Sequence, residues 1–124
     1  MTAPIESYKD LIVWQQAMDL VVATYAETKR WPREELYGLT SQARRAATSI
    51  PANIAEGFAR ENRGSYQQFL RIAQGSLKEL ETHLLIANRI GLASDQSTGE
   101  LLSRAESVGK LLRLLIRKLS EGQP

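Results

Sequence analysis

The chain has 124 residues, of which 43% are hydrophobic and 24% are charged, and this composition is typical of a single globular domain spanning residues 1–124. It contains no cysteine, which excludes disulfide frameworks, thiolate metal sites and cysteine nucleophiles. The N-terminus lacks the basic start and apolar run of a signal peptide, and no stretch reaches the roughly 18 consecutive apolar residues of a membrane span. We therefore expect a cytoplasmic protein that does not cross a membrane.

The net charge of +2 is unevenly distributed along the chain. Residues 30–71 and 101–124 each carry +3, whereas residues 1–29 and 72–100 each carry −2. Arginine outnumbers lysine eleven to five, and the planar guanidinium group suits bidentate contacts with phosphate or carboxylate. The two basic segments are therefore either an anion-binding surface or an ordinary solvated surface neutralised by ion pairs.

The first apolar stripe predicts a helix over residues 8–29. Its members recur at steps of three and four, which places them on one helix face: Leu11, Trp14, Met18, Val21 and Tyr25. The segment WPREELYG interrupts this pattern, since Pro32 favours the start of a new turn and Gly38 marks a second irregularity. A second helix is predicted over residues 34–60, with a stripe of small volume: Leu39, Ala43, Ala46 or Ala47, Ile50, Ile54 and Phe58.

A third helix, over residues 65–90, follows the short turn RENRG. Ser65 and Gln68 have the spacing of a capping box at its start, and Gly91 can supply a left-handed residue at its end. Its stripe consists of Ala73, Leu77, Leu80, Leu84 and Ala87. A fourth helix, over residues 95–120 and capped by Ser94 or Ser97, carries a stripe of Leu101, Ala105, Val108, Leu112, Leu115 and Leu119.

Four amphipathic helices joined by short connections predict an all-α fold, an antiparallel up-down-up-down four-helix bundle. Helix two should be kinked at Pro51, because proline lacks an N–H and its ring presses on the carbonyl of Ala47. The small residues around this proline would allow a neighbouring helix to approach closely. The segment SIPANIAEG is therefore either a tightly packed, kinked core segment or part of a ligand site.

Enzyme chemistry finds little support in the sequence. Carboxylate-bridged di-iron bundles need two Glu-x-x-His pairs, but His83 is the only histidine and Leu80 occupies the required position before it. Glu79 and His83 alone are too few ligands for a zinc centre. The chain has neither a GxSxG nucleophile motif nor a glycine-rich phosphate loop. We therefore expect a non-enzyme without metal or cofactor.

Three segments carry a family resemblance: YKDLIVWQQAMDL, YGLTSQARRAATSIPANIAEGFAR and FLRIAQGSLKELETHLLIANRIG. They resemble the 23S ribosomal RNA intervening-sequence protein family from about Tyr8 to Leu92, roughly two-thirds of the chain, and more loosely through the fourth helix. The resemblance implies an antiparallel four-helix bundle that assembles as a cyclic pentamer. Relatives include the accessory protein of diversity-generating retroelements, which implies nucleic acid and a reverse transcriptase as partners.

The family signature falls on helices two and three. Facing positions on these helices have numbers that sum to about 125, which predicts Ser49 opposite Ser76 and Arg45 opposite Leu80 or Glu79. We expect a polar layer inside the bundle, built on an Arg45–Glu79 ion pair, while Asn53 and Glu56 either cap groups freed by Pro51 or face a neighbouring subunit. The members of this predicted layer are Gln42, Arg45, Ser49, Asn53, Glu56, Ser76, Glu79 and Thr82.

Two functions follow as hypotheses. The first is a homo-oligomer, a cyclic pentamer by resemblance, that buries apolar residues lying off the main stripes: Ile12, Val13, Val22, Leu102, Leu111 and Ile116. This oligomer would bind RNA or DNA nonspecifically through Arg44, Arg60, Arg63, Arg104, Arg113 and Arg117. Base stacking is not expected, since Trp14, Tyr25 and Phe58 fall on stripes predicted to be buried.

The second hypothesis is a protein-binding scaffold or adaptor without nucleic-acid contact. Its arginines would be neutralised by Glu34, Glu35, Glu61 and Glu106.

Overall fold

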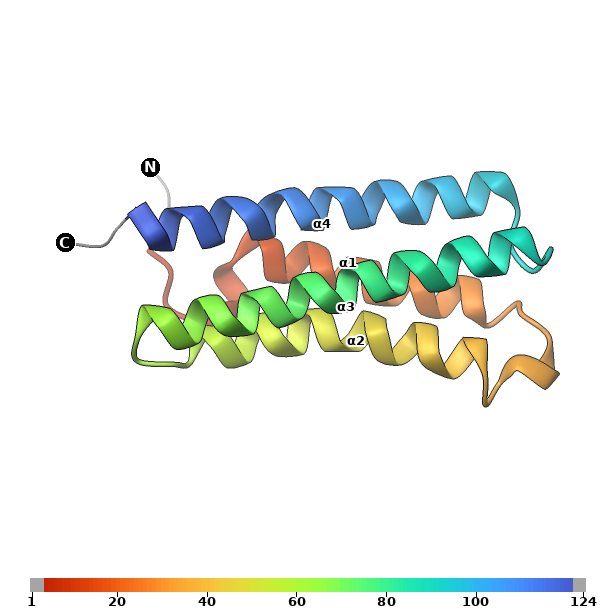
Figure 1. Ribbon diagram of the computed structural model, residues 1–124, viewed down its shortest axis with the longest axis horizontal. Coiled ribbons are helices and arrows are strands. Elements are labelled where there is room, and N and C mark those ends of the chain that lie inside the picture. The colour runs from red at the N-terminus through yellow and green to blue at the C-terminus, as the bar shows by residue number, and fades with distance from the viewer. Residues whose placement is uncertain (1–3, 122–124) are drawn as a thin grey trace.

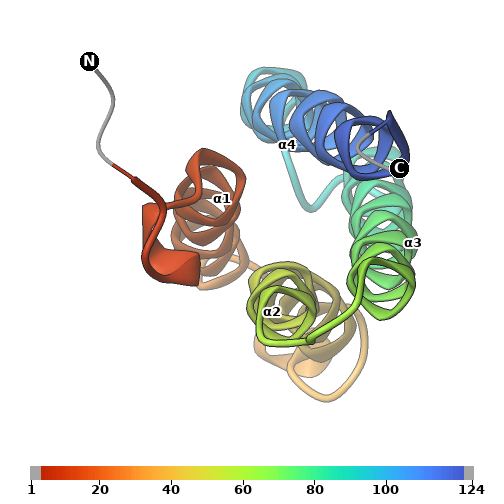
Figure 2. The ribbon, with the colours of Figure 1, turned by 90° about the vertical axis from the view of Figure 1, so that its left-hand side faces the viewer.

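The structure, a computed structural model, describes residues 4–121, and within this range it contains four long α-helices and no strand. These are α1 (Ile12–Thr28), α2 (Leu39–Phe58), α3 (Arg63–Arg89) and α4 (Asp95–Glu121), together with the short 3-10 helices η1 (Tyr8–Asp10) and η2 (Arg33–Glu35). Successive helices run in opposite directions (Figure 1). Viewed end-on, they follow one another around a common core, and each packs against its two neighbours (Figure 2). The all-α prediction is confirmed.

The first two helices begin later than the sequence predicts. Ser7 caps η1 instead of a long helix: its Oγ accepts from Lys9 N at 2.9 Å, and its own N–H donates to the Asp10 carboxylate at 3.1 Å. Leu11 is then extended, so α1 starts at Ile12. Residues 33–35 form η2 where the second helix was predicted to begin, and Gly38 is non-helical with φ −114° and ψ −112°, so α2 starts at Leu39.

The ends of α3 and the start of α4 rest on specific caps. The predicted capping box of Ser65 and Gln68 is wrong, because Asn62 caps α3 and its Oδ1 accepts from Ser65 N at 2.8 Å. Gly91 has φ +84°, the left-handed conformation predicted for it, and allows Leu92 N to donate to the carbonyl of Ala87 at 2.8 Å. Of the two candidate caps for α4, the structure uses Ser94, whose hydroxyl accepts from Ser97 N at 3.0 Å.

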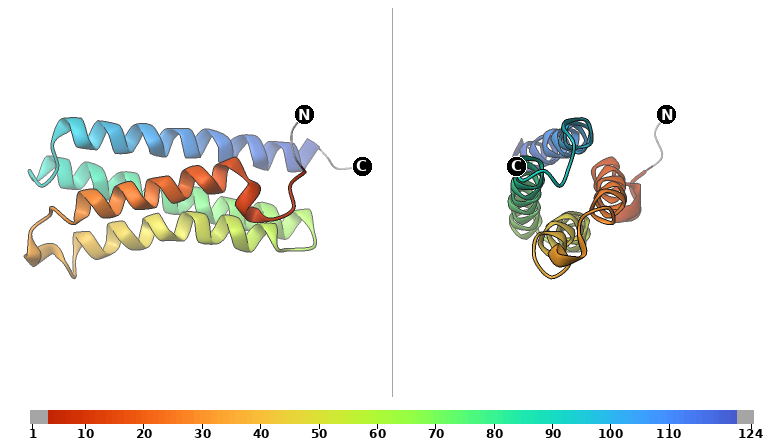
Figure 3. Two further views of the ribbon diagram at one scale, coloured as in Figure 1. Left: turned by 180° about the vertical axis from the view of Figure 1, so that it is seen from behind. Right: turned by 90° about the vertical axis from the view of Figure 1, so that its right-hand side faces the viewer.

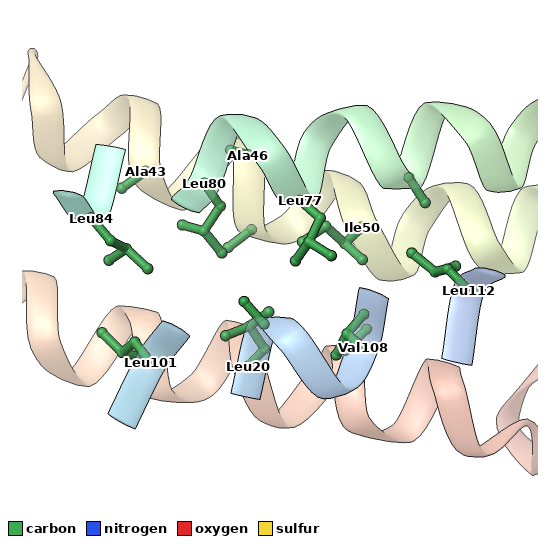
Figure 4. Close-up of a cluster of buried hydrophobic side chains, with 14 of the residues drawn as sticks. Leu20, Ala43, Ala46, Ile50, Leu77, Leu80, Leu84, Leu101, Val108 and Leu112 are labelled. Atoms are coloured by element: carbon green, nitrogen blue, oxygen red, sulfur yellow. The ribbon is translucent and has the colours of Figure 1, made fainter. Parts of the chain in front are cut away.

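The core is built from the stripes predicted on the second, third and fourth helices. Their inward residues are buried or half-buried, and Figure 4 shows the leucines of α3 and α4 interdigitating with Ile50 of α2 and Leu20 of α1. The largest fully buried apolar side chains are Leu20, Ile50, Ile54, Leu70, Leu77, Leu80, Leu84, Val108 and Leu112. These three helices each have one apolar face, so periodicity was enough to find it.

The face predicted for α1 is only partly correct. Leu11, Trp14 and Val21 are half-buried against the core. The buried residues of the helix belong to a neighbouring and less bulky face: Val13, Ala17, Leu20, Thr24, Glu27 and Thr28. Of the predicted stripe, Met18 is 38% exposed and Tyr25 is 41% exposed. Val13, which was predicted to face another subunit, is buried in the core, whereas Ile12 and Val22 are exposed. The helix is therefore apolar on two sides, and one bundle covers only one of them.

The helices α2 and α3 approach closely where α2 carries its small residues. A Cβ atom placed on Gly57 would lie 2.9 Å from Cβ of Phe69 and 3.2 Å from the backbone oxygen of Tyr66. Ala43, Ala46 and Ala47 are buried farther along the same helix. Helix α2 continues through Pro51 without interruption, and the kink at this residue stays a prediction. Within SIPANIAEG, Gly57 thus serves helix–helix packing.

Candidate nucleic-acid interface

The arginines of α4 are the plainest candidates for contact with phosphate. Arg104, Arg113 and Arg117 are all exposed, as is Arg63, the first residue of α3. Arg71, which the sequence analysis did not single out, is also exposed on α3. Arg71 lies outside the apolar stripe of Ala73 and Leu77, and this position predicts an exposed side chain.

Few arginines are neutralised by ion pairs. Within residues 4–121, nine of the eleven arginines have no carboxylate oxygen within 4.0 Å; the two exceptions are Arg30, paired with Glu27 at 3.8 Å, and Arg60, paired with Glu56 at 3.0 Å. Of the acids expected to neutralise arginines, only Glu106 forms an ion pair in this part of the chain, and its partner is Lys110 at 3.3 Å. The guanidinium groups thus remain available to an anion.

Two of the predicted phosphate contacts also have structural roles. Arg44 is half-buried: its Nε donates to Thr28 Oγ1 at 2.8 Å, and its guanidinium group lies 4.5 Å from the centre of the Tyr25 ring. Arg60 lies 4.6 Å from the centre of the Phe69 ring and is engaged with Glu56. Arg44 thus links α2 to α1 and is only partly accessible to solvent.

A shallow groove of about 350 Å³ lies where α1 ends and α2 begins. Its lining combines aromatic, basic and hydroxyl side chains and contains no carboxylate: Tyr25, Leu36, Tyr37, Thr40, Ser41, Arg44, Arg45 and Thr48. Tyr37, which belongs to none of the predicted site residues, is 94% exposed. The sequence indicates this exposure, because Tyr37 lies in the segment WPREELYG and belongs to no apolar stripe. Aromatic rings are therefore accessible here, contrary to the sequence-based expectation.

Part of the predicted polar layer forms. The hydroxyls of Ser49 and Ser76 lie 2.8 Å apart across the α2–α3 interface, as the facing positions predict. Asn53 Nδ2 donates to Ser49 Oγ at 2.9 Å and to the carbonyl of Ser49 at 2.8 Å. Because Ser49 Oγ accepts from Asn53, its own proton can point to Ser76. These three residues tie the two helices together at a half-buried level.

The ion pair at the centre of that predicted layer does not form within residues 4–121. Arg45 and Glu79 are both exposed, and the Glu79 carboxylate lies 3.5 Å from His83 Nε2 on its own helix. Ser49 and Ser76 are half-buried where the two helices meet, whereas Arg45 and Glu79 are exposed outside this contact. Both ring nitrogens of His83 are buried without a hydrogen bond in the described part of the chain.

The remaining members of the predicted layer lie on the surface. Gln42 is exposed, Glu56 pairs with Arg60, and the Thr82 hydroxyl donates to the carbonyl of Lys78 at 2.9 Å. No group of three or more potential metal ligands occurs among residues 4–121. In that same range, no helix has the length and apolar character needed to cross a membrane.

Comparison with known proteins places the chain in a family. A family model described as "23S rRNA-intervening sequence protein" matches residues 9–114. The fold also occurs in the crystal structure of a protein with unknown function from the S23 ribosomal protein family of Bacteroides thetaiotaomicron. That protein is 24% identical to this chain with a TM-score of 0.79, over 85% of this chain and 98% of the other. No curated protein matches this chain.

Proposed function

The chain belongs to the 23S rRNA-intervening sequence protein family, and we propose that it is a non-enzymatic homo-oligomer that binds RNA or DNA without sequence preference. The observation that carries the proposal is the shortage of ion pairs: nine of the eleven arginines have no carboxylate within 4.0 Å in residues 4–121. Unpaired guanidinium groups attract the phosphate backbone of any sequence, because the interaction is electrostatic.

Assembly would strengthen this binding. Arg113 and Arg117 on α4 form only a small basic surface in one chain, but a closed ring repeats that surface in every subunit. Repetition raises the effective concentration of phosphate-binding groups for a long polyanion. We propose a cyclic pentamer, in keeping with the family resemblance, in which neighbours cover the second apolar side of α1.

The exposed side of α1 supports self-association. Ile12 is 61% exposed and Val22 is 67% exposed, and Met18 and Tyr25 of the same helix are 38% and 41% exposed, so large hydrophobic side chains are exposed along the length of α1. Light scattering at micromolar concentration tests the assembly: the wild-type protein should scatter as an oligomer, and Val22→Asp should lower the mass while the helical circular dichroism is retained. A stable wild-type monomer would contradict this part of the proposal.

Binding is tested by titrating a fluorescently labelled mixed-sequence RNA at low and physiological salt. The affinity should fall steeply with salt, and a variant with Arg113→Gln and Arg117→Gln should show a log–log salt slope shallower by about 1.4 on a single strand, about 0.7 for each lost contact. The matched control carries Arg30→Gln and Arg60→Gln. It loses the same two charges from the arginines that are paired with acids, so its slope should change less.

The scaffold function is the alternative outcome of that titration. If the wild-type protein fails to bind RNA at about 50 mM salt, where electrostatic contacts are strong, the arginines do not serve nucleic acid. The exposed apolar side of α1 would then be the main functional surface, and the protein would be an adaptor for other proteins.

A further inference from the structure

The groove between the end of α1 and the start of α2 has the chemistry of a nucleotide site. Figure 3 shows this connection as the orange loop at one end of the bundle. The groove brings together Tyr25, Tyr37, Arg44 and Arg45, and no carboxylate lines it. The acids of the nearby η2, Glu34 and Glu35, form no ion pair within residues 4–121, and Glu35 Oε1 is occupied as an acceptor for Leu39 N at 3.3 Å.

Arg44 is held in position before any ligand arrives. Its Nε donates to Thr28 Oγ1 at 2.8 Å, and the same hydroxyl donates to the carbonyl of Thr24 at 2.8 Å. The Cζ atom of its guanidinium group lies over the Tyr25 ring, 4.5 Å from the ring centre. Since Nε is engaged, the two terminal nitrogens are the groups left for an anion. A fixed arginine loses little conformational entropy when it binds a phosphate.

Tyr37 has no role in the core. Its side chain is 94% exposed, and it forms neither a hydrogen bond nor an aromatic contact with the other described residues. An exposed ring of this size presents a flat apolar face beside two cations. Proteins that bind single-stranded nucleic acids combine aromatic rings with a basic groove. Unpaired bases stack on the rings while the phosphates contact the cations.

We propose that this groove binds single-stranded nucleic acid, with one unpaired base stacked on Tyr37 and the adjoining phosphates bound by Arg44 and Arg45. This inference rests on the nucleic-acid binding proposed above and adds a place and a strand preference to it. A duplex satisfies the arginines equally well, but its bases are stacked on one another and cannot reach Tyr37. The Thr48 hydroxyl, also in the lining, donates to the carbonyl of Arg45 at 3.2 Å, so its oxygen can accept a hydrogen bond from a ribose hydroxyl.

The test is an anisotropy titration of the full chain with a labelled mixed-sequence RNA strand and with the duplex of that strand and its complement. Tyr37→Ala should weaken binding of the single strand by about fivefold or more, the effect of removing one stacking ring, and should leave duplex binding nearly unchanged. Tyr37→Phe keeps the ring and should bind as the wild type does. Leu114→Ala, which trims a 55% exposed side chain at the opposite end of the bundle, is the control for surface truncation.

The outcomes separate this inference from the function it rests on. If the wild type binds neither the single strand nor the duplex at low salt, the groove inference and the proposed function are both wrong. The groove inference is overturned, and the proposed function stands, if Tyr37→Ala binds the single strand as tightly as the wild type does. In that case the wild type still binds RNA, and the variant with Arg113→Gln and Arg117→Gln still binds it less tightly. A lowered oligomeric mass of Tyr37→Ala in light scattering would also overturn the groove inference, because the ring would then pack against another copy. The groove inference would also be overturned if a phosphorylated peptide displaced the labelled single strand as effectively as unlabelled RNA does.

Discussion

Replacing Gly57 by alanine tests the close approach of α2 and α3. The new Cβ atom would lie 2.9 Å from Cβ of Phe69, 3.0 Å from Cδ1 of Tyr66 and 3.2 Å from the backbone oxygen of Tyr66. Favourable contacts between carbon atoms occur at about 3.5–4.0 Å, so the separation must increase by roughly half an ångström or more. Two of the three contacted atoms are fixed to the α3 backbone and cannot rotate away. The helices themselves must therefore move apart.

Two opposing effects determine the size of the change. Alanine in place of glycine favours a helix by about 0.5–1 kcal/mol, whereas overpacking a well-packed interface costs typically 1–3 kcal/mol. Separation of the helices also weakens the Ser49–Ser76 hydrogen bond, worth about 1 kcal/mol. We expect a net loss of about 1–3 kcal/mol in the free energy of unfolding. For a chain of this length, that loss lowers the melting temperature by about 4–12 °C.

The assay is thermal and urea denaturation followed by circular dichroism, at one fixed protein concentration because assembly also contributes to stability. Gly75→Ala is the matched control, since Gly75 is an exposed residue of α3 with no atom within 4 Å of the added Cβ. It should raise stability by about 0.5–1 kcal/mol. A Gly57→Ala protein that is as stable as the wild type, or more so, would refute the close approach of the two helices.

Four further substitutions test the cap of α3, a surface pair and the half-buried Tyr66. Asn62→Ala should cost about 1 kcal/mol in thermal melts, whereas Ser65→Ala should cost little, since the cap is Asn62. Glu79→Ala should stay within about 1 kcal/mol of the wild type in urea, because the Glu79 side chain is 60% exposed although His83 is not; a loss of about 3 kcal/mol would indicate a buried pair instead. Burial raises the pKa of Tyr66 above 10.0, so its contribution to stability is complete below that pH and is lost as the pH rises through the folded-state pKa. Tyr66→Phe should therefore lose less stability than the wild type in alkaline titrations.

The sequence predicts an element well where a helix has one apolar face. The stripes of the second, third and fourth helices reappear as the core of the bundle, and Gly91 ends α3 in the left-handed conformation expected of it. The prediction for α1 is only partly correct because this helix is apolar on two sides, so periodicity alone does not say which side is buried. The predicted stripe includes Met18 and Tyr25, which are exposed, whereas the structure buries Ala17 and Thr24.

The candidate site was less predictable than the fold. Pairing residues whose numbers sum to about 125 correctly predicts the Ser49–Ser76 contact, because a short turn fixes the register of the two helices. The same pairing does not distinguish the half-buried contact between the helices from the exposed position of Arg45. The groove escaped detection because it joins residues from α1, the connection and α2. No single stripe contains Tyr37 and Arg44 together.

The arrangement of the helix ends has a practical consequence for experiments with attached labels. Helix α1 begins and α4 ends at the same end of the bundle, while the connection between α1 and α2, which contains Tyr37, lies at the other end (Figure 1). Since α4 has 27 residues, about 40 Å of helix separates the two ends. A dye, a surface linker or a fused domain joined beyond either outer helix end therefore stands well away from the groove. The protein can be immobilised through such an attachment and still offer Tyr37 to a strand in solution.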